Sequence, residues 1–263
     1  MRFAPVCLGA KLFYIIYKNN MVWGMLKKLI CFSFLISAFI IFPVKANTLN
    51  NDTSDPLFML HQEGVLSKTT LTYWDNILRA GQYVSYGLNN RLTIGANIHF
   101  QQDFDGPEDG FSAIDLGAVY RLAGAESNSA RIIYDLLLGF KFGGSEKVRT
   151  PFFADSTYYA GLRFGRQWAG VTLAATIQSS WIFDETRGMS YIDFIPEAYF
   201  RVSQDWRLGG GLTLRKSTNP AFNQEWVNFK FLRQYGRTQY IGHVDYEFES
   251  DEFQLGMQVN ILF

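Results

Sequence analysis

Few side chains of this sequence have the types and spacing that catalysis needs. Beyond residue 46 the histidines are His61, His99 and His243, and only His243 has a carboxylate two residues away, at Asp245. An Asp–His pair can orient an imidazole as a general base, but a nucleophile or a bound water must complete such a site. The chain has no Gly-x-Ser-x-Gly, His-Glu-x-x-His or phosphate-binding glycine motif. The sequence therefore predicts no catalytic residue, no metal ligand set and no cofactor.

One acidic stretch has oxygen ligands at close spacing. Asp103, Asp105, Glu108 and Asp109 lie in the run Asp-Phe-Asp-Gly-Pro-Glu-Asp-Gly. Carboxylates are ligands that Ca²⁺ and Mg²⁺ prefer, but this spacing does not match a complete EF-hand loop. We expect a solvated surface loop, with a divalent-cation site as the alternative.

The elements that carry these residues are predicted to be β-strands. From Val65 onward, short segments that alternate apolar and polar residues are separated by turn residues, and a 3.6-residue period is almost absent. Tight turns alternate with longer loops along this part of the chain. The predicted strands are twelve in number, at residues 65–74, 81–89, 91–102, 111–122, 131–143, 157–166, 170–183, 190–203, 207–217, 225–235, 239–249 and 252–263.

The last predicted strand is the most regular. Every second residue is apolar, at Phe253, Leu255, Met257, Val259, Ile261 and Phe263. This strand resembles the closing strand of bacterial outer-membrane β-barrels, whose assembly machinery reads a terminal phenylalanine with apolar residues at every second position. The resemblance implies that the barrel assembly machinery is a partner and that the assembly signal consists of Phe263, Ile261, Val259 and Met257. The alternative is an edge strand of a soluble sheet.

The outward faces of the predicted strands favour the membrane barrel. One such face carries only apolar or aromatic side chains, and Arg233, close to a turn, is the only outward charge that we identify. A soluble sandwich would expose lysine and glutamate, whereas a transmembrane barrel presents an apolar band to lipid. The predicted fold class is all-β: a closed antiparallel up-and-down transmembrane β-barrel of about twelve strands. Its predicted location is the bacterial outer membrane, in contact with lipids and lipopolysaccharide.

The residues before the barrel form two predicted segments. Lys27 and Lys28 precede an uncharged apolar run, and Val44-Lys45-Ala46 offers the small or modest side chains that signal peptidase reads. Residues 1–46 are therefore predicted to be a secretory signal peptide, with 1–20 as an upstream extension. The apolar run, about 14 residues or 21 Å as a helix, is too short to span a membrane. Residues 47–64 are polar and either hang in the periplasm or plug the barrel, which spans residues 65–263.

Loss of residues 1–46 would change the charge of the chain. Six of its 24 basic residues and none of its 24 acidic residues lie there, which leaves 18 basic residues against 24 acidic ones and a net charge of −6. An acidic chain argues against a nucleic-acid partner. Both cysteines, Cys7 and Cys31, also lie in this segment, so the predicted mature chain has no thiol chemistry.

The inward faces of the predicted strands collect charges of both signs. Such groups need either water or mutual pairing. Twelve strands lie between the eight whose interior is filled by side chains and the sixteen that leave a wide channel. The sequence therefore favours a narrow channel for small polar or zwitterionic solutes. The predicted lumen residues are Arg163, Asp193, Glu197, Arg201, Arg215, Lys230, His243, Asp245, Glu247 and Glu249.

Two other functions remain open. In a structural or interaction barrel, ion pairs such as one between Asp193 and Arg215 would close the lumen. In an open pore, acidic strands near the end of the chain would instead face basic strands and set up a transverse field. A membrane-embedded hydrolase is the third alternative, but the His-x-Ser pair of outer-membrane phospholipase A is absent here. Within the eighth predicted strand, Pro196 predicts a β-bulge or a local break.

Overall fold

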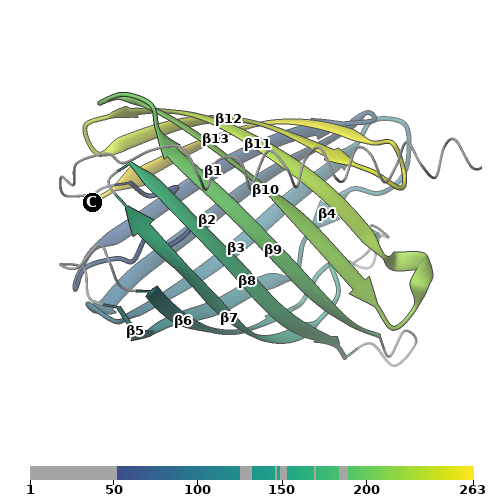
Figure 1. Cartoon of the computed structure of the whole chain (residues 1–263). Helices are drawn as coiled ribbons and strands as arrows, with labels where there is room; N and C mark the ends of the chain where they lie inside the picture. Colours follow the sequence, from purple (N-terminus) through teal and green to yellow (C-terminus); the bar gives the residue numbers. More distant parts are fainter. Residues whose placement is uncertain (1–51, 125–131, 146, 149–152, 169, 184–188) are drawn as a thin grey trace, which may run out of the picture. The chain divides into compact units, whose positions relative to one another are not determined.

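Alternating side chains produce long antiparallel strands throughout the part of the chain that the structure describes. The computed structural model describes residues 52–124, 132–145, 147–148, 153–168, 170–183 and 189–263, and the predicted signal peptide lies outside them. The elements are β1 (Val65–Trp74), β2 (Ile77–Asn89), β3 (Leu92–Asp103), β4 (Gly110–Phe111), β5 (Ile114–Ala123), β6 (Ile132–Phe142), β7 (Thr157–Trp168), β8 (Val171–Ile182), β9 (Ser190–Arg201), β10 (Trp206–Ser217), the short 3₁₀ helix η1 (Pro220–Phe222), β11 (Gln224–Tyr235), β12 (Thr238–Glu247) and β13 (Phe253–Leu262) (Figure 1).

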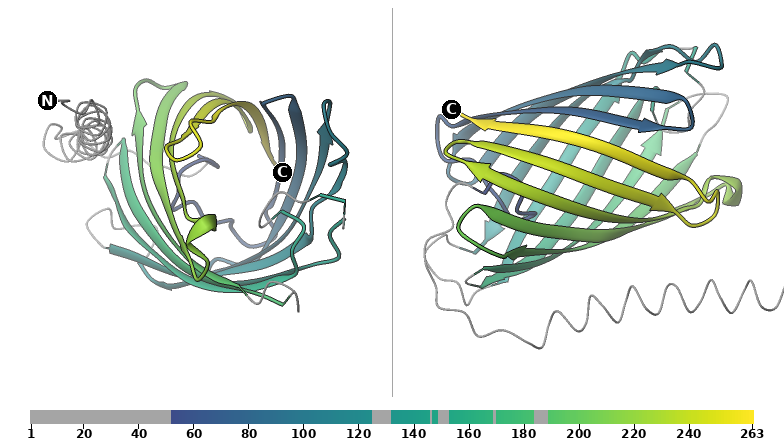
Figure 2. Two further views of the ribbon diagram at one scale, coloured as in Figure 1. Left: turned by 90° about the vertical axis from the view of Figure 1, so that its right-hand side faces the viewer. Right: turned by 90° about the horizontal axis from the view of Figure 1, so that it is seen from above.

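The strands close into a ring. Apart from the short β4, each strand pairs with the next long strand along the chain, and β1 also pairs with β13, where Leu66 is the partner of Leu262. The two-residue β4 pairs with the end of β3 and takes no part in the closure. Twelve strands therefore form a closed antiparallel barrel (Figure 2), which confirms the predicted fold class. Among the described residues, no helix is long and apolar enough to cross a membrane.

The two faces of the barrel wall differ as predicted. On β6, Leu138 and Phe140 point outward and are 47% and 49% exposed, whereas Asp135 points inward and is fully buried. The expectation that Arg233 is the only outward charge is wrong. Arg166, Lys216 and Glu225 also lie on the outer face, because each pairs in register with an outward-facing apolar residue of the neighbouring strand. Each lies within two residues of a strand end, where a long side chain can reach the polar interface.

The two ends of the barrel have different connections. At one end, here called the short-turn end, lie Val65, Phe263 and the tight turns at 90–91, 202–205 and 236–237. At the other, the loop end, lie the longer loops at 104–113, 143–156 and 248–252. A bilayer-spanning barrel of bacterial type has short periplasmic turns and longer external loops.

Pro196 interrupts the wall locally, as predicted. Pairing between β9 and β10 stops after Glu197 and Gly211 and resumes at Phe194 and Leu214 with the same register. The missing N–H of proline is therefore accommodated by a break in the ladder, with no change in register.

Candidate functional site in the barrel lumen

The segment of residues 52–60, here called the N-terminal segment, enters the lumen at the short-turn end. Figure 2 shows the first coloured residues inside the ring of strands. The Asp52 carboxylate accepts hydrogen bonds from Arg207 Nε at 2.8 Å and from Gln239 Nε2 at 2.7 Å, and it also accepts one from the Tyr199 hydroxyl. These partners come from β10, β12 and β9, so one side chain of the segment joins three strands.

Asp55 provides a second attachment, on the neighbouring strands β7 and β8. Its carboxylate accepts hydrogen bonds from the backbone N–H of Leu57 at 2.8 Å, from Gln167 Nε2 at 3.0 Å and from the Thr172 hydroxyl. Burial raises the pKa of Asp55 to about 6, and these three hydrogen bonds reduce the effect only in part.

Apolar and neutral polar contacts complete the docking of the segment. Leu57 is buried against Ile133 and Ala174, and its carbonyl oxygen accepts a hydrogen bond from Arg121 at 2.7 Å. Thr53 donates to Gln239 at 3.0 Å. The backbone hydrogen bonds of the segment are internal, from Asp55 N to Asp52 O and from Phe58 N to Asp55 O. Side chains hold the segment in place, therefore, and no described strand pairs with it. Of the two alternatives left open by the sequence, the structure shows the segment inside the barrel.

Most charges of the lumen are paired along its wall. Asp135 lies between Arg121, at 2.9 Å, and Arg163, at 2.6 Å. Arg215 binds Asp193 with both Nε and Nη2, at 2.7 and 2.9 Å. In both cases the partners are neighbours in register on adjacent strands. The pairs therefore lie flat against the wall and do not cross the lumen.

The remaining predicted lumen residues divide into two groups. Lys230 lies 3.4 Å from Glu197, and His243 Nδ1 lies 2.7 Å from Asp245. Arg201, by contrast, lies at the end of β9 on the short-turn side. Glu247 is buried and accepts a hydrogen bond from the Ser250 hydroxyl within its own hairpin, and Glu249 is exposed in the following turn. The expected gathering of acids on one side and bases on the other is thus largely replaced by local pairs.

Two inward-facing histidine rings lie against the barrel wall because the residue opposite each of them is glycine. His243 pairs in register with Gly256, where an added Cβ would lie 2.1 Å from Nε2 of the ring. His99 pairs with Gly81, where an added Cβ would lie 2.1 Å from the ring Cδ2. The absence of a side chain at these glycines lets the imidazoles lie across the neighbouring strand.

Described residues line at least two cavities in the lumen. The one next to the N-terminal segment has a volume of about 260 Å³ and is lined by Ser54, Asp55, Lys68, Tyr83 and Glu197 among others. The other, here called the loop-end chamber, has a volume of about 680 Å³. Its lining combines aromatic rings with charges of both signs, at Trp74, Arg79, Lys141, Arg215, Asp245 and Glu252.

Sequence reasoning missed two parts of this site. Arg79 was absent from the predicted lumen because the second strand was predicted to begin at residue 81, whereas β2 begins at Ile77. A predicted strand that began four residues earlier would have placed Arg79 among the inward-facing residues. Asp52 and Asp55 lie in a segment without periodicity, so no pattern assigned them a partner.

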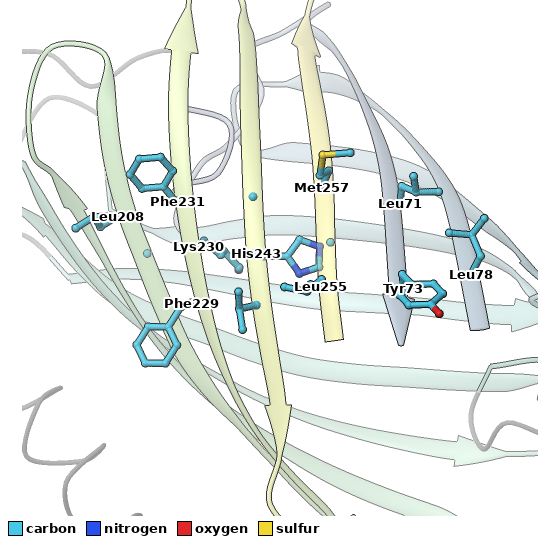
Figure 3. A pocket seen from close by; sticks show the side chains of 14 residues that line it. Leu71, Tyr73, Leu78, Leu208, Phe229, Lys230, Phe231, His243, Leu255 and Met257 are labelled. Atoms are coloured by element: carbon cyan, nitrogen blue, oxygen red, sulfur yellow. The ribbon is translucent and has the colours of Figure 1, made fainter. Parts of the chain in front are cut away.

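A third hollow lies on the outer wall. It is a groove of about 650 Å³ over β10 to β13 and the β1–β2 hairpin. Figure 3 shows Leu208, Phe229 and Phe231 on one side of this groove and Leu71, Tyr73 and Leu78 on the other. Gly242, with open space where a Cβ would be, forms part of its floor. This groove opens on the apolar exterior, and Lys230 and His243 line both it and the lumen cavity of about 260 Å³.

The acidic loop bears no sign of a metal site. Asp103 accepts hydrogen bonds from the backbone N–H groups of Asp105 and Gly106 at 3.0 and 2.9 Å, and Asp109 accepts one from Asp103 N at 2.8 Å. Backbone donors therefore already occupy carboxylate oxygens of this loop. Within the described ranges, no three His, Cys, Asp or Glu side chains are grouped so that they could hold a metal ion.

Comparisons with known proteins agree with this architecture. No protein-family model matches the chain, and no curated protein matches it. The chain is similar in structure to the KdgM porin, with a TM-score of 0.56 and 14% identity over 74% of this chain and 98% of that one. It is also similar to the NanC porin (TM-score 0.58, 8% identity, 75% and 98% covered) and to an outer-membrane channel from Pseudomonas putida F1 (0.56, 9%, 82% and 100%). The chain thus has the fold of bacterial outer-membrane β-barrels, and its apolar exterior agrees with the predicted location in that membrane.

Proposed function

We propose that this barrel is an outer-membrane channel for small polar solutes and that the N-terminal segment restricts its short-turn end. Solutes enter the loop-end chamber, pass the Glu197–Lys230 ion pair, and leave past residues 52–60. The structurally similar KdgM and NanC proteins are described as porins, which is consistent with this proposal.

The observation that carries the proposal is the direction of the ion pairs. Asp193 with Arg215, and Asp135 with Arg163, join adjacent strands of the wall. Pairs of this kind neutralise buried charge without filling the centre, and a chamber of about 680 Å³ remains. The Asp193–Arg215 pair expected of a closed structural barrel does form, but it lies along the wall, and closure of the lumen would need pairs that cross it. The hydrolase alternative has no specific contact in its favour.

Conductance in a planar bilayer tests the proposal. The predicted mature chain, residues 47–263, should give discrete single-channel steps, and a chain that starts at His61 should give larger steps because the segment is gone. Heat-modifiable migration on a gel should confirm that both chains are folded. Folded barrels that give no steps, with or without the segment, would favour the structural alternative.

A further inference from the structure

Arg79 is a cation that neutral groups hold in place. Its Cζ atom lies 4.6 Å from the centre of the Trp74 ring and 4.2 Å from that of Phe153, and one terminal nitrogen donates to Gln101 Oε1 at 2.7 Å. Its Nε is buried and has no hydrogen-bond partner. No described carboxylate forms an ion pair with this side chain. The guanidinium is therefore positioned in advance but retains unused capacity to donate hydrogen bonds.

Arg215, the other arginine that lines the loop-end chamber, is already bound to a carboxylate. Arg215 lines the same chamber but already holds the Asp193 carboxylate with two nitrogens. An arginine fork matches a carboxylate in this geometry. Arg79 can make the same kind of contact only with a group that comes from outside the described chain.

The strand order places acidic groups on the other side of Trp74. Thr72 on β1 pairs with Arg79 on β2 and with Gly256 on β13, so β1 lies between the two. Glu252 directly precedes β13 and, like Asp245 on β12, lines the chamber. Two strand spacings, about 10 Å, separate β2 from β13, and Glu252 lies four residues, about 13 Å, beyond Gly256 toward the loop end.

Glu252 also lacks a cation. It forms no ion pair within the described chain, and burial, with repulsion from Glu247 and Asp75, raises the pKa of its carboxyl group. A positive group that entered the chamber here would reduce this repulsion. The chamber thus presents a cation and a carboxylate that have no ion-pair partner among the described residues, one on each side of β1.

We propose that the loop-end chamber binds zwitterionic solutes of about dipeptide size, with the carboxylate on Arg79 and the ammonium group toward Glu252. This inference rests on the proposed channel function, because it names the class of solute that the channel selects. Fixed charges at both ends would orient a dipolar solute at the entrance of the lumen.

Equilibrium binding to the folded barrel in detergent tests the proposal without any need for conduction. The probes are glycylglycine, N-acetylglycylglycine, which lacks the ammonium group, and glycylglycine amide, which lacks the carboxylate. Glycylglycine should bind best, and each relative should bind about tenfold more weakly, as expected for loss of one charge-assisted contact. Equal binding of the three peptides, or no binding at all, would overturn the proposal.

Variants assign the two ends of the site. Arg79→Gln should weaken glycylglycine binding about tenfold or more, and Glu252→Gln, in the half-buried residue before β13, should abolish the preference for glycylglycine over its acetylated form. Arg91→Gln removes an exposed charge at the short-turn end and should change neither. Unchanged binding in folded Arg79→Gln would remove the site, and an unchanged preference in Glu252→Gln would remove the role of the ammonium group.

The two proposals fail separately. Single-channel steps without peptide binding would leave the channel function standing and would refute the site. Peptide binding that depends on Arg79 in a barrel without steps would support the site and refute the channel.

Discussion

Arg207 Nε donates a hydrogen bond to Oδ2 of Asp52 at 2.8 Å, and both side chains are almost completely buried. This ion pair fastens the N-terminal segment to β10. Replacement of one partner leaves the other charge buried without compensation, which costs about 3–5 kcal/mol in comparable pairs.

Asp52→Asn should therefore release the segment from the lumen. We expect single-channel conductance to increase toward that of the chain that starts at His61. Asp205→Asn is the matched control, because it removes an exposed carboxylate in the turn just before β10. Equal conductance of Asp52→Asn and the unchanged protein would show that the pair does not hold the segment.

Docking of the segment should depend on pH through Asp55. Its pKa in the docked state, about 6, lies above the ordinary value of 3.8, so the docked segment binds a proton more readily than the released one. The contribution to docking is complete below about pH 4 and is lost as the pH rises through about 6. The difference corresponds to about 3 kcal/mol.

Conductance should accordingly be lower at pH 4.5 than at pH 7.5. Asp55→Asn cannot ionise, so this pH dependence should disappear in the variant. A pH profile that is the same in both proteins would assign the effect to another group.

The face assignment predicts opposite results at neighbouring positions of β8. Ile177 is 47% exposed on the outer face, and Gln178 points into the lumen. Ile177→Arg should lower the free energy of unfolding by about 2–4 kcal/mol, the penalty for arginine near the middle of a bilayer. Gln178→Arg should cost much less, as measured by urea-dependent unfolding in lipid vesicles. Equal losses would mean that the two faces of β8 are misassigned.

The terminal phenylalanine should matter for assembly more than for stability. Phe263 N donates to Val65 O at 2.8 Å, but its side chain is 64% exposed. Phe263→Asp should therefore fold in detergent as the unchanged protein does. In cells it should fail to reach the outer membrane, as measured in membrane fractions. Normal amounts there would contradict the predicted assembly signal.

The strands were predictable because each needs only local information. Side chains of a β-strand alternate between two faces, and a lipid-facing band tolerates few charges, so the pattern of β6 or β13 is visible within about ten residues. The pairing of Asp193 with Arg215 was foreseen as one alternative because a short turn fixes the register of β9 and β10. The full set of lumen residues was harder to predict, because the side that Glu247 and Glu249 face depends on where β12 ends.

The position of the N-terminal segment could not be predicted in this way. Asp55 contacts Gln167 and Thr172, and Asp52 contacts Tyr199, Arg207 and Gln239. No sequence period links residues so far apart, and the segment has no alternation of its own. Its docking depends on the shape of the completed lumen.

The same contacts constrain the order of folding. Asp52 binds residues 147, 155 and 187 positions later in the chain, and Thr53 is a hydrogen-bond acceptor for Asn260 on β13, the last strand. Contacts of such long sequence separation form late because they carry the largest loop-closure cost. The first described residues of the chain are thus expected to be among the last to find their place, after β1 has met β13. Residues 52–60 would then become protected from protease only when the barrel is complete, so the time at which this protection appears would measure the rate of barrel assembly.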